Sequence, residues 1–331
     1  MARGNSSTVA LALGLLLMNL VGDCYAQCSA NFKVGYYEGK CGKYDVEAIT
    51  FHVVKKYYLE DPDTVADLVR LNFHDCFVNG CDASILIEGE GTEKVAPPNL
   101  SVAGYEIIEE IKVYLDQYCP GVVSCADIIV LAARAATFLG GAYWYNVETG
   151  RKDGNVSLAI NAVQGLPSPR IPVSDAIKLF ASYGLDTSDF VYLLGCHTVG
   201  TAHCVNFEDR LYNFQNTGNP DPTMAPTLLS SLQKKCPRGA NSNNQDFLDQ
   251  TKGSEFKMDN GFFKSILEGE GLLQVDQELA YHPETRPIVV RAANDEKVFL
   301  AKIGPAMRKM GLIGVITEGK NRVGTCRKVN Y

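Results

Sequence analysis

The chain has 331 residues, with 38 acidic against 31 basic side chains and a formal net charge of −7 at neutral pH. This length is enough for one large domain or for two closely packed lobes. Because the acidic surplus is spread along the chain rather than collected in a tail, the composition argues against a general nucleic-acid binder, which would carry a basic surface.

Residues 1–26 have the pattern of a secretory signal peptide. Arg3 supplies the positive start, residues 9–21 form an apolar core, and Ala26 ends a small-residue cleavage site. The core is too short to span a bilayer, and no later stretch is apolar for long enough to do so. We therefore expect an exported protein with no membrane span, whose single domain covers residues 27–331. A retained membrane anchor is the alternative.

The cysteine content also indicates export. The chain has 11 cysteines, which suits an oxidising compartment, where disulfides persist. Cys24 belongs to the expected signal peptide, so ten of the 11 cysteines remain in the mature chain. Spacing alone does not determine how these cysteines are paired.

The apolar pattern predicts a mostly helical protein. Strand signals are few and allow only short pairs, with one strand expected within residues 140–154. The predicted helices cover residues 45–60, 64–75, 103–118, 124–139, 174–183, 189–195, 223–235, 261–267, 283–293 and 295–310. Asp63 is placed to cap the second of these helices, and Thr187 or Ser188 the sixth.

The second predicted helix carries a candidate catalytic group. Arg70 and His74 are four residues apart, and Phe73 is three residues from Arg70. A helix therefore places a fixed cation, a titratable base and an apolar wall on one face. A lone helical histidine is more often a packing or surface residue than a catalyst. Here an aspartate and a loop between two cysteines follow directly, so the candidate is the whole segment and not the histidine alone.

Four segments resemble those of the secretory plant haem peroxidases, also called class III peroxidases. They are LVRLNFHDCFVNGCDAS at residues 68–84, LPSP at 166–169, LLGCHTVGTAHC at 193–204 and GLLQVDQEL at 271–279. The resemblance extends from about Val34 to Cys326. It implies the haem peroxidase fold, in which a distal and a proximal helical lobe enclose one haem b, with minor short β strands.

On the proximal side, the resemblance implies that His197 binds the haem iron and that Asp276 accepts a hydrogen bond from the other ring nitrogen. On the distal side, it implies that His74 accepts and returns the peroxide proton while Arg70 stabilises the developing negative charge. Peroxide would be reduced to water through a ferryl intermediate, which two one-electron donors return to the resting state. His203 lies in the same run as His197, and no role is assigned to it.

The resemblance assigns further roles around the haem. Phe73 would keep donors at the haem edge, Asn99 would hydrogen-bond His74, and the carbonyl of Pro167 would accept a hydrogen bond from an aromatic donor. Asn99 also begins an Asn-X-Ser glycosylation sequence. An inward-facing side chain would not be glycosylated, so Asn155 is the better acceptor.

Two calcium sites are implied by the same resemblance. The expected distal ligands, with Glu93 acting through water, are Asp75, Val78, Gly80, Asp82, Ser84 and Glu93. The expected proximal ligands are Thr198, Asp249, Thr251 or Ser254, the carbonyl of Lys257, and Asp259. The proximal run is two residues longer than the family pattern, so its hydroxyl ligand stays open. The alternative for the distal loop is an ordinary turn rich in Asp and Gly.

The resemblance also implies four disulfides, which are Cys41–Cys119, Cys76–Cys81, Cys125–Cys326 and Cys204–Cys236. Two cysteines of the mature chain are then left over. Cys28 would be free or would bridge to another chain, whereas Cys196 is expected to be a buried, unreactive thiol.

Three functions are open at this point. The first is a secreted monomeric peroxidase of the cell wall or vacuole that oxidises phenolic or similar small donors, in peroxide catabolism, oxidative stress or lignin formation. The second is a non-catalytic secreted protein that keeps the scaffold for calcium binding or cell-wall interaction. The third is a zinc hydrolase, for which the chain lacks an HExxH motif or a close trio of ligands. Only the first uses Arg70, His74, His197 and Asp276 together, so we expect an active peroxidase.

Overall fold

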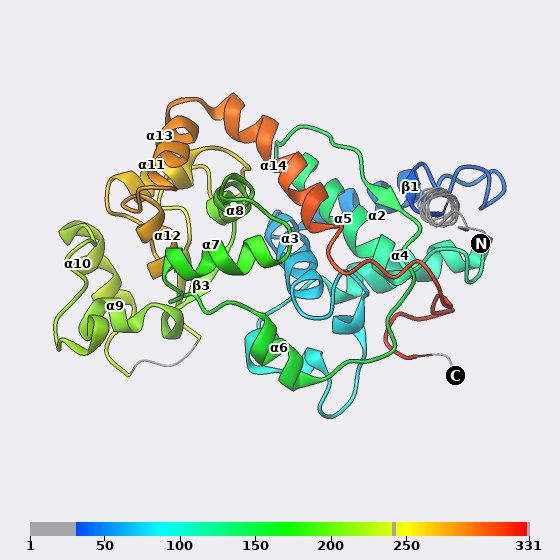
Figure 1. The fold of residues 1–331 in the computed structure, drawn as a ribbon, viewed down its shortest axis with the longest axis horizontal. Helices are drawn as coiled ribbons and strands as arrows, with labels where there is room; N and C mark the ends of the chain where they lie inside the picture. The colour runs from blue at the N-terminus through cyan, green and yellow to red at the C-terminus, as the bar shows by residue number, and fades with distance from the viewer. Residues whose placement is uncertain (1–30, 240–242, 330–331) are drawn as a thin grey trace, which may run out of the picture.

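The computed structural model describes residues 31–239 and 243–329. The expectation of a mostly helical fold with short strands is confirmed (Figure 1). The α-helices are α2 (Val46–Glu60), α3 (Thr64–Cys76), α4 (Tyr105–Tyr118), α5 (Cys125–Leu139), α6 (Ala159–Gly165), α7 (Val173–Ser182), α8 (Thr187–Leu194), α9 (Glu208–Tyr212), α10 (Pro226–Lys235), α11 (Gly261–Leu267), α12 (Gln274–Leu279), α13 (Arg286–Asn294) and α14 (Glu296–Met310). Two antiparallel strand pairs accompany them: β1 (Lys33–Val34) with β2 (Glu148–Thr149), and β3 (Thr201–His203) with β4 (Gln245–Phe247). The expected signal peptide and Cys28 lie outside the described residues.

Helix α3 lies between two hydrophobic cores. Val65 and Val69 belong to a core that includes buried residues of α7, α8, α11, α13 and α14. Leu68 and Leu71 belong to a second core with buried residues of α2, α4 and α5. Because these pairs point to different faces of the helix, α3 joins a lobe of N-terminal helices to a lobe of C-terminal helices (Figure 1). The candidate catalytic helix is thereby packed on both sides.

Two of the predicted helix caps are wrong. Asp63 makes no cap hydrogen bond to α3. Its own N–H instead donates to Oδ1 of Asp61 at 3.0 Å, so Asp61 organises the turn that precedes the helix. Helix α8 is capped by Asp186, whose side chain accepts from the N–H of Asp189 at 2.8 Å, and not by one of the two hydroxyl residues that follow it. Asp186, one position before Thr187, is the cap because it forms a reciprocal capping box with Asp189.

Other helix boundaries also differ from the prediction. Helices α10 and α13 begin at Pro226 and Arg286, each three residues later than the apolar pattern indicated, and each has a proline in its first two positions. Helices α6, α9 and α12, of seven, five and six residues, were not predicted, because no apolar period was evident in such short segments, although α11, also of seven residues, was predicted. In the described part of the chain, no helix is long and apolar enough to cross a bilayer.

The described residues contain four disulfides, which are the four pairs that the resemblance implied: Cys41–Cys119, Cys76–Cys81, Cys125–Cys326 and Cys204–Cys236. The third of them links residues 201 positions apart and so fixes the C-terminal segment against α5. Cys196 is a buried free thiol. Burial raises the pKa of Cys196 to about 12, which keeps it protonated and agrees with the expected unreactive thiol.

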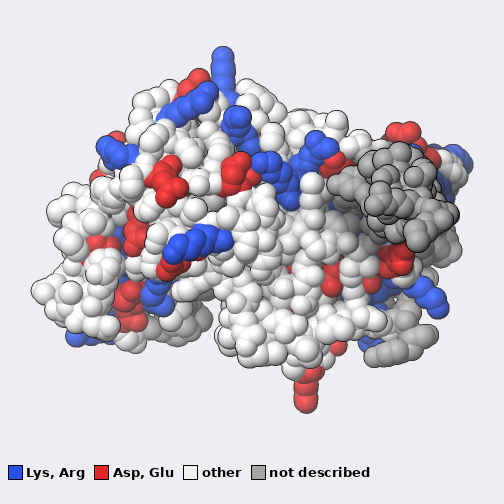
Figure 2. All heavy atoms as spheres, in the orientation of Figure 1, with Lys and Arg blue, Asp and Glu red and all other residues white. Residues whose placement is uncertain are grey.

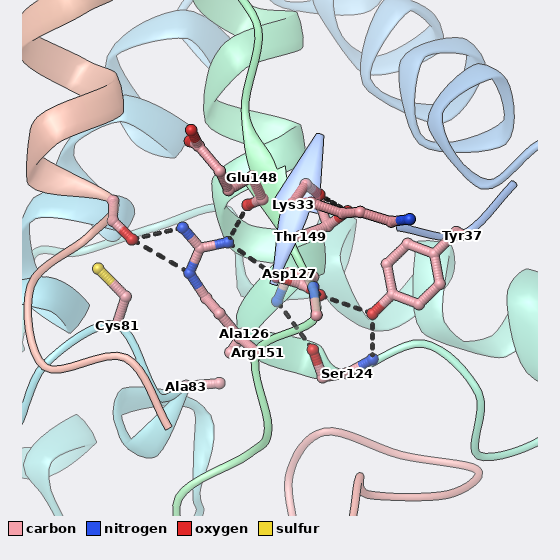
Figure 3. Close-up of polar contacts among 12 residues, drawn as sticks. Lys33, Tyr37, Cys81, Ala83, Ser124, Ala126, Asp127, Glu148, Thr149 and Arg151 are labelled. Atoms are coloured by element: carbon pink, nitrogen blue, oxygen red, sulfur yellow. Dashed lines mark hydrogen bonds and ion pairs between the residues drawn. The ribbon is translucent and has the colours of Figure 1, made fainter. Parts of the chain in front are cut away.

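A buried ion pair ties three further segments together (Figure 3). Arg151 and Asp127 lie 2.8 Å apart, and their side chains are 1% and 0% exposed. Arg151 also donates to the carbonyl oxygens of Glu148 and Gly311, while the hydroxyl of Tyr37 donates to Asp127 at 2.6 Å. Burial, followed by the negative charge of Asp127, raises the pKa of Tyr37 well above its ordinary value. The pair therefore connects α5, the β1–β2 ribbon and the end of α14.

Candidate active site

A cavity of about 540 Å³ lies beside α3, where this helix faces β3, α14 and the short 3₁₀-helix η4 (Gly195–Thr198). Five of the predicted site residues line it, namely Arg70, Phe73, His74, Pro167 and His197. Helix α3 delivers the first three, and η4 delivers His197 at the end of α8. The two histidines are far apart in the sequence, so only the packing of the lobes brings them to one cavity.

The orientation of His74 is set by Asn99. The amide nitrogen of Asn99 donates to the carbonyl oxygen of Glu93 at 2.8 Å, which turns the amide oxygen towards the histidine. Oδ1 of Asn99 lies 2.6 Å from Nδ1 of His74, so Nδ1 is the nitrogen that carries the proton. The other nitrogen, Nε2, is then the basic one, and it lies 3.3 Å from Nε of Arg70.

His74 is held neutral by its surroundings. Burial is the largest cause, and the positive charge of Arg70 is the second; together they lower the pKa of His74 to about 3. The hydrogen bond with Asn99 acts in the opposite direction but is weaker. A neutral imidazole with a free Nε2 is able to accept a proton across the ordinary range of pH.

Arg70 is anchored by the 3₁₀-helix η3 (Pro97–Asn99) and by the loop that follows it. Its Nη1 donates to the carbonyl oxygen of Ser101 at 2.7 Å. Its Nη2 donates to the hydroxyl of the same serine at 3.1 Å and to the carbonyl oxygen of Pro98 at 3.3 Å. Burial lowers the pKa of Arg70, yet a guanidinium stays charged in proteins. The loop thus fixes a permanent cation beside Nε2 of His74, and Ser101 is a site residue that the sequence did not indicate.

His197 has a different partner from His74. Its Nδ1 lies 2.9 Å from Oδ1 of Asp276, a carboxylate whose side chain is 0% exposed, while the histidine side chain itself is 31% exposed. The carboxylate requires Nδ1 to be the donor, which leaves Nε2 as a potential metal ligand. The sequence-based pairing of these two residues is therefore present in the geometry, although they lie on η4 and α12.

The residues around the cavity fit the haem that the resemblance implies. His197 offers an imidazole oriented by a carboxylate, which is the usual arrangement of an iron ligand. Apolar side chains line the cavity around it, including Leu194, Val199, Leu273 and Val275. A flat, largely apolar cofactor with a central metal would therefore find both a ligand and matching walls.

Three buried oxygen atoms of the predicted distal calcium site have no hydrogen-bond partner among the described residues: Oδ1 of Asp75, Oγ of Ser84 and Oε2 of Glu93. Burial raises the pKa of Asp75 well above its ordinary value, and the negative charge of Asp82 raises it further. Burial also raises the pKa of Glu93 to about 7. Unpaired buried oxygens are costly unless they are protonated or bound to a cation, so this cluster suits a hard cation.

The remaining expected distal ligands lie in the same turn. A Cβ atom at Gly154 would fall 2.0 Å from Oδ2 of Asp82, so only glycine allows the backbone to approach this carboxylate. Val78 and Gly80 lie between Asp75 and Asp82, and the N–H of Asp82 donates to the carbonyl of Gly80 at 2.8 Å. Within residues 31–239 and 243–329, no three His, Cys, Asp or Glu side chains form a metal site by themselves. Hydroxyl and carbonyl oxygens would therefore have to complete the proposed distal calcium site.

Thr198 is the centre of a second oxygen cluster, at the predicted proximal calcium site. Its hydroxyl lies 3.1 Å from Oδ2 of Asp249, 3.2 Å from the carbonyl oxygen of Lys257 and 3.3 Å from Oδ1 of Asp259. A Cβ atom at Gly261 would fall 2.3 Å from Oδ2 of Asp249 and 2.9 Å from Oδ1 of Asp259. Four of the expected oxygen donors therefore converge beside His197.

Of the two alternative hydroxyl residues, Thr251 is closer to this cluster. Its Oγ1 would lie 2.9 Å from a Cβ atom at Gly261, whereas the hydroxyl of Ser254 donates to the carbonyl of Thr251 at 3.2 Å. Ser265 on α11 also joins the cluster, since it donates to Oδ1 of Asp249 at 3.2 Å. A serine on a seven-residue helix belongs to no motif, so no sequence signal pointed to it.

Three carboxylates of the cavity wall were not predicted as site residues: Asp61, Asp63 and Asp67. The sequence did contain a signal for two of them, because positions 63, 67, 70 and 74 follow one stripe of a helix. Burial, followed by the negative charge of Asp63, raises the pKa of Asp67 to about 6. Among the described lining residues, Arg70 supplies the only Lys or Arg side chain, so acidic side chains outnumber basic ones in this wall.

His203 also lines the cavity, from strand β3. Its Nδ1 is buried without a hydrogen-bond partner among the described residues. Among the described residues it makes no hydrogen bond to His74 or His197, and the geometry assigns it no chemistry of its own.

Comparisons with known proteins agree with this geometry. A family model described as peroxidase matches residues 50–295. Peroxidase 57 of Arabidopsis thaliana is 44% identical over 302 residues, which is 91% of this chain and 93% of that protein. Peroxidase 60 of the same plant is 42% identical over 318 residues, or 96% of this chain and 93% of that protein. Peroxidase 28 of the same plant is 43% identical over 308 residues, with 91% and 94% covered.

Proposed function

The chain belongs to the peroxidase family and is a peroxidase, and we propose that it is a secreted haem enzyme that oxidises phenolic or similar small donors in one-electron steps. One observation carries this proposal: two histidines share a cavity but have different partners, an amide at His74 and a carboxylate at His197. An anionic carboxylate makes an imidazole a stronger ligand, whereas the neutral amide of Asn99 orients the ring of His74 and raises its pKa only weakly. The two histidines therefore suit two duties, metal binding and proton transfer.

The reaction with peroxide would depend on three side chains of this cavity. When bound, haem would supply a redox-active iron, and the imidazole of His197 would hold it. His74 would take a proton from one oxygen of hydrogen peroxide at Nε2 and return it to the other, so that water can leave. Arg70 would stabilise the negative charge that develops as the oxygen–oxygen bond breaks. Phe73 would limit how deeply a donor enters.

Asn99 and Asp276 would act as positioning residues. Asn99 links Nδ1 of His74 to the backbone of Glu93, a residue of the proposed distal calcium site. A cation bound there would therefore hold the residue that orients the proton-transfer base. We propose one calcium ion at this site and a second one around Thr198, beside the proposed iron ligand.

Family membership bears on the alternatives that the sequence left open. The relatives with 40–44% identity carry the name peroxidase, which leaves the zinc hydrolase and the non-catalytic scaffold without support. Four disulfides favour an oxidising compartment, and we propose an extracellular or vacuolar monomer with Asn155 as its glycan acceptor. Roles in peroxide catabolism, oxidative stress or the oxidation of cell-wall phenolics belong to the same proposal.

The proposal is tested by the absorption spectrum and by turnover. Protein purified from a eukaryotic secretion host should show a Soret band, and the band should be lost or shifted in a His197→Ala variant. The wild type should oxidise guaiacol only when hydrogen peroxide is present. A colourless protein, or a haem protein without peroxide-dependent turnover, would overturn the proposal.

The rate of the reaction with peroxide should depend on pH in a way set by His74. Its pKa is lowered to about 3, so the imidazole is neutral and able to accept a proton at all higher pH values. We expect a second-order rate constant that is flat from about pH 5 to 8 and falls about tenfold per pH unit below about pH 3. A stopped-flow pH jump would measure this rate constant before the protein unfolds in acid. A decline centred near pH 6.5, the ordinary value for histidine, would contradict the buried, neutral base.

Removal of bound cations should lower both stability and the rate with peroxide. Without a cation, the buried oxygens of Asp75, Ser84 and Glu93 lack partners. Glu93 is then held less firmly, and so is Asn99, which donates to the Glu93 carbonyl. We expect chelator treatment to lower the melting temperature by several degrees, and added calcium to restore it better than magnesium. Calorimetry of the treated and reloaded protein would measure this, and no change after verified metal removal would contradict the calcium sites.

A further inference from the structure

Six aliphatic side chains form an exposed surface beside the cavity, which we name the aliphatic surface. They are Val95 (49% exposed), Leu100 (72%), Val156 (54%), Leu158 (48%), Ile160 (55%) and Val163 (51%). Single exposed aliphatic residues are common on soluble proteins and need no explanation. A group of them on neighbouring elements is unusual and is typical of a binding surface.

The elements that carry these side chains lie side by side. Helix α6 packs against η3 and against the 3₁₀-helix η2 (Glu93–Val95). The N–H of Ala159 donates to the carbonyl of Gly91 at 2.8 Å, and the N–H of Glu93 donates to the hydroxyl of Ser157 at 3.0 Å. Where Figure 1 places α6, the surface in Figure 2 shows neither basic nor acidic side chains. The elements that carry the aliphatic surface are therefore neighbours, and the part of it at α6 is uncharged in this view.

The aliphatic surface adjoins residues of the cavity wall at two points of the chain. Leu100 directly precedes Ser101, which lines the cavity together with Pro98. On the other side, α6 runs directly into Leu166 and Pro167, which also line the cavity. A ligand with one end in the cavity could therefore lay its other end along α6 without leaving the protein surface.

The charge of the cavity wall restricts what such a ligand can be. Asp61, Asp63 and Asp67 line the cavity, and the negative charge of these carboxylates disfavours a carboxylate on an entering ring beside them. A neutral phenol meets no such repulsion. Esterification of a phenolic acid removes the carboxylate charge and at the same time adds an alkyl chain.

We propose that the aliphatic surface binds the apolar tail of an amphipathic phenol, such as the alkyl ester of a hydroxycinnamic acid, while its ring enters the cavity. This inference rests on the proposed function. Two donor molecules each lose one electron and the phenolic proton, and with one hydrogen peroxide they give two phenoxyl radicals and two waters. The tail takes no part in the chemistry and contributes only apolar contact, so its effect falls on KM rather than on kcat.

The test compares the methyl and octyl esters of ferulic acid as donors for the holoenzyme, below the micelle concentration of the octyl ester. N-linked glycans are removed first, so that sugar on Asn155 does not cover Val156. We expect a KM for the octyl ester about tenfold below that for the methyl ester. The doubly substituted Ile160→Ser/Val163→Ser variant should lose most of this advantage, with the methyl ester unaffected. Val113→Ser on α4, where the valine is 43% exposed, is the matched control and should keep it.

Calorimetric titration of the resting holoenzyme with each ester, without peroxide, gives a second readout that needs no turnover. The octyl ester should bind about tenfold more tightly than the methyl ester, and only the Ile160→Ser/Val163→Ser variant should reduce the difference. If the wild type oxidises neither ester, the proposed function fails. If it oxidises both with equal KM, or if the variant keeps the full advantage, the function stands and this inference is overturned.

Two other occupants of the aliphatic surface would also overturn the inference. A dimer in analytical ultracentrifugation that Ile160→Ser/Val163→Ser dissociates would assign the surface to a second copy of the chain. Flotation of the wild type, but not of this variant, with phosphatidylcholine vesicles would assign it to a lipid surface. Monomeric protein that does not float supports the ester-binding role.

Discussion

A His74→Ala variant is expected to react with hydrogen peroxide about 10²- to 10⁴-fold more slowly than the wild type. The variant removes the group whose Nε2 lies 3.3 Å from Arg70 and whose Nδ1 is held by Asn99. His197 also has an oriented tautomer, but its Nε2 is the nitrogen proposed to bind the iron, so His197 does not replace His74 as the base. The loss should therefore fall on the peroxide step and leave the donor KM almost unchanged.

Stopped-flow mixing with peroxide measures this step, and the Soret band of the resting protein shows whether haem is retained. His52→Ala is the matched control, because His52 also lies on a helix but faces solvent, with its Nδ1 on the carbonyl of Ala48 at 2.6 Å. We expect the control to keep the wild-type rate. A His74→Ala variant that retains haem and reacts within a factor of three of the wild type would remove His74 from its proposed role.

An Asp127→Ala variant is expected to lower the free energy of unfolding by about 3–5 kcal/mol. The variant leaves the guanidinium of Arg151, 1% exposed, without its carboxylate, and it removes the acceptor of the Tyr37 hydroxyl. Figure 3 shows that the same guanidinium reaches the carbonyl at the end of α14, so the loss should loosen three segments at once. Chemical unfolding with the disulfides intact measures the change.

The exposed pair of Asp175 and Lys178 provides the matched control for this prediction. Their side chains are 56% and 76% exposed at a distance of 3.0 Å, and Asp175→Ala should change stability by less than about 0.5 kcal/mol. Replacing both buried partners, in Asp127→Leu/Arg151→Met, should recover most of the loss, because no charge is then left unpaired. Equal destabilisation by Asp127→Ala and Asp175→Ala would show that burial of the Asp127–Arg151 pair does not increase its contribution to the free energy of unfolding.

The local features of this protein, such as the faces of its longer helices, could be predicted from the sequence. Helical periodicity placed Arg70, Phe73 and His74 on one face, because positions three and four apart always share a side of a helix. Apolar content identified α5 as a buried helix, and the structure agrees, with its residues from Cys125 to Thr137 buried. The pairing of His197 with Asp276 came from the resemblance, and the geometry places them 2.9 Å apart. Three of the short helices, α6, α9 and α12, were missed, since a helix of five to seven residues shows little of its period, whereas the equally short α11 was predicted.

What the sequence by itself determined were the properties that depend on neighbours along the chain: helix faces, the export pattern and the two histidine motifs. Only the tertiary structure decided which residues from distant segments meet. It joined Asp127 to Arg151, replaced Asp63 by Asp61 at the start of α3, and brought Ser265 to the cluster around Thr198. It also left the aliphatic side chains of α6 exposed beside the cavity. The physical reason is that periodicity acts over a few residues, whereas burial and unpaired polar atoms are set by the packing of the whole chain.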